Sequence, residues 1–106
     1  TFIISSEKKL DFNHGLKLTE AAVLTDRSSG RQLTLYTDAP GLQVYSGNFM
    51  GGNLFKGGVP SRKHGAICLE TGFYPDSPNR PDFPCCIFGP DRDYQCTAVF
   101  KFETVK

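Results

Sequence analysis

Glu70 is the first residue whose type and setting could support chemistry. Its carboxylate stands in the otherwise apolar run HGAICLET at residues 64–71. If that run is a strand, Glu70 shares a face with Ala66 and Cys68. On a concave, partly buried sheet face, the pKa of a carboxyl group rises toward that of a useful general base. The alternative is that Glu70 lies on the solvent face of the sheet, since charged residues are rarely buried unless they are paired.

Gln43 is the second candidate, in the run GLQVYSGN at residues 41–48. Alternation places Gln43 and Tyr45 on one face of a strand and Leu42 and Val44 on the other. An amide that both donates and accepts hydrogen bonds, beside an aromatic ring, suits the recognition of a sugar hydroxyl. An exposed polar strand residue without a ligand is the alternative interpretation.

The two histidines do not complete a nucleophilic pair. His64 and Cys68 are four residues apart, which along a strand is roughly 13 Å and too far for proton transfer. His14 is best interpreted as a loop residue and Asp76 as a turn residue. The Gly-Gly pairs are not followed by the Lys-Ser/Thr of a phosphate-binding loop, so nucleotide binding is not expected.

Four cysteines could form two disulfides or hold a metal: Cys68, Cys85, Cys86 and Cys96. No C-x-x-C pair is present and both histidines are remote from most of the cysteines, so no metal site is predicted. The neighbours Cys85 and Cys86 can bridge only in a strained ring. Cysteines among apolar residues behave as small hydrophobic side chains. We therefore expect reduced thiols and a cytoplasmic location.

Composition and charge exclude several classes of partner. The chain has 106 residues, is 39% hydrophobic and 22% charged, and carries a formal net charge of +1, as an ordinary globular protein does. Lysine and arginine are scattered, and the run Arg62-Lys63-His64 is more simply a solvated turn than a polybasic patch. No nucleic-acid partner is predicted. No apolar run approaches the length of a membrane span, so no membrane partner is predicted either.

Alternation between turn signals predicts an all-β fold. Strands are expected at residues 16–26, 31–38, 42–48, 65–71 and 94–102. The DRSSG run at 26–30 supplies turn chemistry for a hairpin between the first two of them. A Gly-rich connection without a periodic segment follows at 49–63, and a loop of this length tends to be functional or mobile. The Pro-punctuated connection at 75–84 cannot be a helix interior or a central strand. No window of a dozen residues carries a helical stripe, so a β-sandwich or barrel is expected.

Three stretches carry a resemblance to a known family. Residues 39–49 read APGLQVYSGNF, residues 63–71 read KHGAICLET, and residues 73–84 read FYPDSPNRPDFP. In this order and at these separations they resemble the aldose 1-epimerase (galactose mutarotase) family, and the SGR turn at 29–31 fits as well. The resemblance covers the chain from about Leu18 onward. It implies a part of a galactose mutarotase-like β-supersandwich.

The resemblance also implies roles for two residues. Glu70 falls on the Glu of the family's Cys-Leu-Glu-Thr motif, its general base, and Gln43 falls on the Gln of Pro-Gly-x-Gln, which hydrogen-bonds sugar hydroxyls. The implied reaction interconverts the α and β anomers of hexoses such as galactose and glucose by acid/base ring opening. No metal or cofactor is implied.

Other parts of the family pattern are missing or altered. The family's histidines, its sugar-binding Arg and a sugar-gripping Asp belong upstream of Thr1, and neither His14 nor His64 matches the family acid. Gly72 stands where the family usually has a polar residue, and Cys85-Cys86 where small or apolar residues are expected.

The chain therefore resembles the C-terminal segment of a single mutarotase-like domain. It opens on the apolar run TFII without an initiator Met, whereas the termini of whole domains are usually polar. We expect residues 1–106 to lack the N-terminal part of the domain, which either the same gene product or an associated chain would supply. The chain by itself is expected to be inactive.

Two alternatives to a mutarotase remain. One is a non-catalytic carbohydrate-binding β-sandwich module that keeps Gln43 but has lost the acid. The other is a relative of hexose-6-phosphate epimerases, which would need an Arg-rich phosphate site. Arg62, Arg80 and Arg92 show no such clustering in the sequence.

Overall fold

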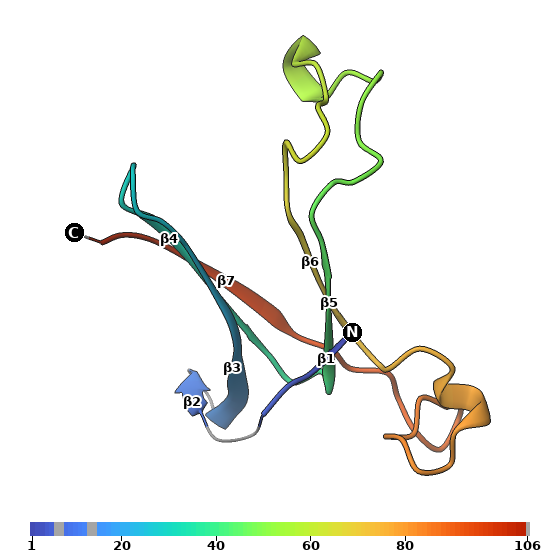
Figure 1. Cartoon of the computed structure of the whole chain (residues 1–106). Coiled ribbons are helices and arrows are strands. Elements are labelled where there is room, and N and C mark those ends of the chain that lie inside the picture. The colour runs from blue at the N-terminus through green and yellow to red at the C-terminus, as the bar shows by residue number, and fades with distance from the viewer. Residues whose placement is uncertain (6–7, 13–14, 106) are drawn as a thin grey trace.

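The computed structural model describes residues 1–5, 8–12 and 15–105. They form two antiparallel sheets, one ordered β1-β5-β6 and the other β2-β3-β4-β7 (Figure 1). The described residues contain no α-helix, and short 3₁₀ turns lie at Lys56–Gly58 and Ser77–Asn79. Within these residues no helix is long and apolar enough to span a membrane. The all-β prediction is confirmed. The interpretation of His14 as a loop residue falls outside the described residues.

The larger sheet contains β2 (Lys9–Phe12), β3 (Leu16–Asp26), β4 (Arg31–Thr37) and β7 (Ala98–Thr104). The predicted hairpin is confirmed, because β3 and β4 pair through the turn at 26–30. The Asp26 carboxylate accepts hydrogen bonds from the hydroxyls of Ser28 (2.7 Å) and Ser29 (2.6 Å). Gly30 closes the turn at a φ of 74°, a backbone conformation that glycine adopts without strain.

The smaller sheet contains β1 (Phe2–Ile3), β5 (Gly41–Tyr45) and β6 (Cys68–Gly72). The prediction of a strand from residue 65 was wrong at its start. The chain still turns there, because the Gly65 amide donates to the Arg62 carbonyl (2.9 Å) and His64 has a left-handed φ of 59°. Strand β6 therefore begins only at Cys68.

The last strand also begins later than predicted. Instead of extending from Tyr94, β7 starts at Ala98. The Tyr94 ring packs edge-on against Phe88, with 5.0 Å between ring centroids. The Asp38 carboxylate accepts a hydrogen bond from the Thr97 amide (2.8 Å). These contacts hold residues 94–97 in the irregular connection that precedes the strand.

The buried core is small for a chain of this length. Leu18 and Leu35 are fully buried, and Leu42 and Tyr36 nearly so. The accessible surface is 8170 Å², whereas a compact protein of 11.7 kDa exposes about 5,900 Å². The radius of gyration is 16.5 Å, against about 13 Å for a compact domain of this length. The two sheets thus leave much apolar surface uncovered.

Candidate functional site

The pairing of β5 with β6 brings the two predicted site residues together. In the antiparallel register Gln43 lies directly opposite Glu70, and Tyr45 lies opposite Cys68. Directly opposed residues project from the same face of a sheet, with their Cβ atoms about 5 Å apart. Gln43, Tyr45, Cys68 and Glu70 therefore form one continuous patch on one face. Leu42 and Val44 point to the opposite face, as alternation requires.

Thr1, which directly precedes β1, extends this patch beyond β5 on the side away from β6. The Thr1 hydroxyl donates a hydrogen bond of 2.6 Å to Oε1 of Gln43. Because β1 pairs with β5 on the side away from β6, Thr1, Gln43 and Glu70 form a row across the sheet. With its Oε1 engaged, the Gln43 amide presents its NH₂ group as a donor. Thr1 was not among the predicted site residues, since its position in the row depends on pairing between distant segments.

The Glu70 side chain is exposed in this chain. Among the described residues, none forms an ion pair or hydrogen bond with its carboxylate. This matches the solvent-face alternative considered from the sequence. The partial burial that a tuned general base needs is not supplied by the described residues, and other polypeptide would have to cover this face.

A turn borders the patch at the end of β5. The Phe49 amide donates to the Tyr45 hydroxyl (3.0 Å), so the turn at residues 46–50 contacts the Tyr45 end of the patch. The His64 Nδ1 lies 2.9 Å from the Ser46 carbonyl oxygen. His64 thus contacts the turn at 46–50 through its imidazole.

The predicted turn role of Asp76 is confirmed. Asp76 precedes the 3₁₀ turn Ser77–Asn79 with a φ of 63°. Its carboxylate accepts a hydrogen bond of 2.6 Å from the Asn79 side chain. All four cysteines are free thiols. Within residues 1–5, 8–12 and 15–105, no group of three or more metal-ligating side chains gathers.

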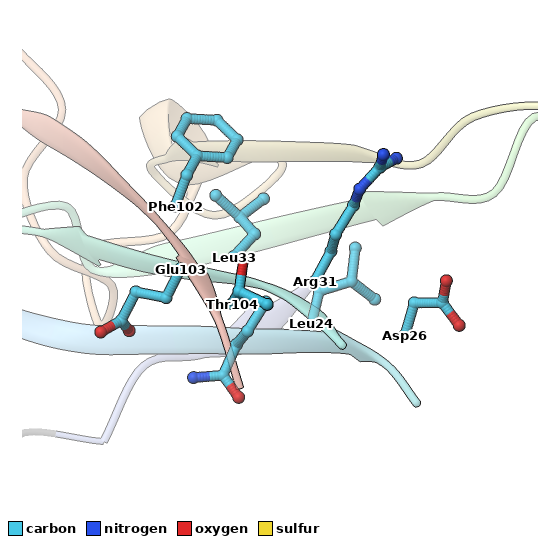
Figure 2. Close-up of a pocket in the computed structure, with 8 residues that line it drawn as sticks. Leu24, Asp26, Arg31, Leu33, Phe102, Glu103 and Thr104 are labelled. Carbon is cyan, nitrogen blue, oxygen red and sulfur yellow. The ribbon is translucent and has the colours of Figure 1, made fainter. Parts of the chain in front are cut away.

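A hollow of about 500 Å³ lies on the other sheet (Figure 2). Its floor is the cross-strand row Leu24, Leu33 and Phe102, contributed by β3, β4 and β7. Phe102 is 77% exposed and Leu24 41% exposed. The hollow lacks the predicted site residues, and its row of large apolar side chains is typical of a surface that packs against protein rather than of a sugar site.

Comparison with known proteins identifies a family. The family model of aldose 1-epimerase matches residues 2–101. The galactose mutarotase of Mus musculus is 42% identical over 99 residues, which is 87% of this chain and 29% of the mouse protein. The galactose mutarotase of Bos taurus is 47% identical over 76 residues, 71% of this chain and 22% of the bovine protein.

A bacterial relative matches as well. The aldose 1-epimerase of Escherichia coli (strain K12) is 42% identical over 73 residues, which is 67% of this chain and 21% of the bacterial protein. The chain therefore spans less than a third of the length of the relatives that it matches.

Proposed function

This chain belongs to the aldose 1-epimerase family, and from that premise we propose that it carries the catalytic base and one sugar-binding side chain of a mutarotase active site. Glu70 is the base and Gln43 the sugar contact. The observation that supports this assignment best is the cross-strand pairing of Gln43 with Glu70. Because their Cβ atoms are about 5 Å apart, a hydrogen-bonding amide and a carboxylate at these positions can both reach one sugar ring.

The proposed reaction opens and recloses a hexose ring. The Glu70 carboxylate takes the proton of the anomeric hydroxyl, and a C1=O double bond forms while the bond from C1 to the ring oxygen breaks. The electron pair of that bond stays on the ring oxygen, which takes a proton from a general acid. Rotation about C1–C2 and closure on the other face of the carbonyl give the other anomer. Galactose and glucose are the proposed substrates.

The general acid is proposed to come from outside residues 1–106. His64 faces the Ser46 carbonyl, and the chain spans only 29% of its mouse relative. We propose that residues 1–106 are the C-terminal segment of a single domain. The remaining part lies on the same gene product or on an associated chain. It supplies the acid and covers the exposed face around Glu70. The extensive uncovered apolar surface supports this division.

The free thiols support a reducing compartment as the proposed location. Cys68, Cys85 and Cys96 are exposed and Cys86 is partly exposed, and exposed unpaired thiols persist where glutathione and thioredoxin keep them reduced. The cytoplasmic location stays a prediction. It is tested by fractionating cells that express the full-length protein and following it with an antibody.

Polarimetry tests the proposed function. The full-length protein is expected to speed the approach of α-galactose and α-glucose to anomeric equilibrium, whereas residues 1–106 alone give no acceleration above buffer. Sugar binding measured by calorimetry, without any mutarotation by the full-length protein, would favour the non-catalytic binding module instead. Robust mutarotation by residues 1–106 alone would show that the acid lies within them.

A further inference from the structure

His64 ties together the two ends of the long excursion between β5 and β6. Its Nδ1–H donates to the Ser46 carbonyl (2.9 Å), and its backbone amide donates to the Gly47 carbonyl (3.0 Å). Both acceptors follow directly after the end of β5, and β6 begins four residues after His64. A single residue near the start of β6 therefore makes two hydrogen bonds to the segment that follows β5.

The backbone of His64 adopts a conformation that is costly for its residue type. Its φ of 59° is left-handed, and Asp76 is the other non-glycine residue in the described ranges with a positive φ. Such a conformation is strained for a residue with a Cβ atom and persists where the surroundings enforce it. Glycine or asparagine would fit the backbone more readily, but glycine has no side chain to reach the Ser46 carbonyl.

The turn that His64 holds is also tightly packed. The Gly47 carbonyl accepts a second hydrogen bond from the Met50 amide (3.2 Å). A Cβ atom added at Gly47 would lie 2.7 Å from the Met50 sulfur and 3.2 Å from the Ala66 carbonyl oxygen. The backbone at Gly47 is therefore closely surrounded, and His64 hydrogen-bonds the carbonyls of Ser46 and Gly47 at the start of the turn.

This turn lies beside the patch that carries Gln43 and Glu70. The Phe49 amide donates a hydrogen bond to the Tyr45 hydroxyl, and Tyr45 projects from the same face as Gln43. We propose that His64 is a positioning residue, which holds the 46–50 turn as a fixed rim of the sugar site. The inference rests on the proposed function. A fixed rim restricts where the sugar lies over Gln43 and Glu70, so it acts on sugar binding more than on proton transfer.

Three variants of the full-length protein test this role. His64→Gly keeps the left-handed backbone but removes the imidazole, so KM for galactose is expected to rise roughly fivefold with kcat within about twofold, as for the loss of one hydrogen bond. His64→Asn keeps a donor near the position of Nδ1 and tolerates the left-handed φ, so it should restore KM. Asp76→Gly is the matched control, because it relaxes the other left-handed non-glycine residue and should leave KM unchanged.

Amide hydrogen exchange supplies a readout that does not depend on activity. In His64→Gly the Met50 amide should exchange at least several-fold faster than in the wild type, and in His64→Asn at about the wild-type rate. An inactive wild-type protein would refute the proposed function. The exchange rates would still test whether His64 holds the turn at residues 46–50. Unchanged KM and unchanged Met50 exchange in His64→Gly would overturn the inference, as would a fall in kcat with KM unaltered.

Discussion

Gln43 lies directly opposite Glu70 in the antiparallel pair of β5 and β6, and this relationship joins two residues that are 27 positions apart in the sequence. The intervening excursion leaves the sheet after Tyr45 and returns at Cys68 (Figure 1). A polar amide and a carboxylate thus face the same volume from neighbouring strands.

Replacing Glu70 by Gln in the full-length protein should lower kcat by roughly two to four orders of magnitude, because the side chain keeps its shape but loses the ability to accept the anomeric proton. Polarimetry of galactose mutarotation measures the effect. Glu103→Gln is the matched control, since Glu103 pairs with Lys101 on the other sheet (2.7 Å). A Glu70→Gln protein with near-normal turnover would remove Glu70 from the mechanism.

Replacing Gln43 by Ala should raise KM roughly two- to tenfold with a smaller effect on kcat, because one hydrogen bond to the sugar is worth about 0.5–1.5 kcal/mol. Steady-state polarimetry over a range of sugar concentrations separates the two constants. Gln32→Ala serves as the control: Gln32 also accepts a hydrogen bond from a threonine, Thr25 (3.0 Å), but lies on the larger sheet. An equal rise in KM in both variants would argue against a sugar contact at Gln43.

Replacing Phe102 by Asp should destabilise the full-length protein but should make residues 1–106 alone more soluble. In the full-length protein the row Leu24, Leu33 and Phe102 is expected to be covered, so a buried unpaired charge should lower the free energy of unfolding by roughly 3–5 kcal/mol. In residues 1–106 alone, where Phe102 is 77% exposed, the same change should increase solubility.

Urea denaturation of the full-length protein and light scattering of the short chain measure these effects of the Phe102 substitution. Lys101→Ala, which changes the neighbouring residue on the opposite face, is the control. An unchanged urea midpoint in full-length Phe102→Asp would mean that the row stays exposed in the whole protein.

The hydrogen bonds in the turn at residues 26–30 predict that part of the folding stability is lost as the pH falls from about 4 to about 2. Hydrogen bonds from the Ser29 side chain, and then from the Ser28 side chain and amide, lower the pKa of Asp26 from its ordinary 3.8 to about 2. A carboxyl group with a depressed pKa in the folded state stabilises that state above its unfolded pKa. This contribution is lost as the pH falls from about 4 through about 2. NMR titration of the Asp26 carboxyl carbon measures the pKa directly.

Asp26→Asn should flatten the fall in melting temperature between pH 4 and pH 2, because the amide does not titrate. Asp11→Asn is the comparison, since it removes a carboxylate from another position of the same sheet. An Asp26 titration midpoint near its ordinary value would show that the serine hydrogen bonds do not persist in solution.

The sequence predicted strands and turns correctly where side-chain periodicity and turn chemistry act over a few residues. The strand over 16–26 and the hairpin turn at Asp26–Gly30 follow from such patterns, and β3 has the predicted bounds. The strand starts at 65 and 94 were missed for physical reasons. The left-handed backbone at His64 and the packing of Tyr94 against Phe88 interrupt the extended conformation that side-chain alternation predicts, and alternation carries no signal for either.

The sequence alone was enough to single out Glu70 and Gln43, because a carboxylate and an amide interrupt otherwise apolar alternating runs and fall within family motifs. Tertiary structure decided that the two residues face each other, since a slip of one residue in the β5–β6 pairing would send one of them to the other face. Tertiary structure also placed Thr1 beside Gln43 and placed the His64 imidazole against the Ser46 carbonyl at the end of β5. Periodicity is a local property of the chain, whereas register and cross-strand contacts depend on hydrogen bonds between segments distant in sequence.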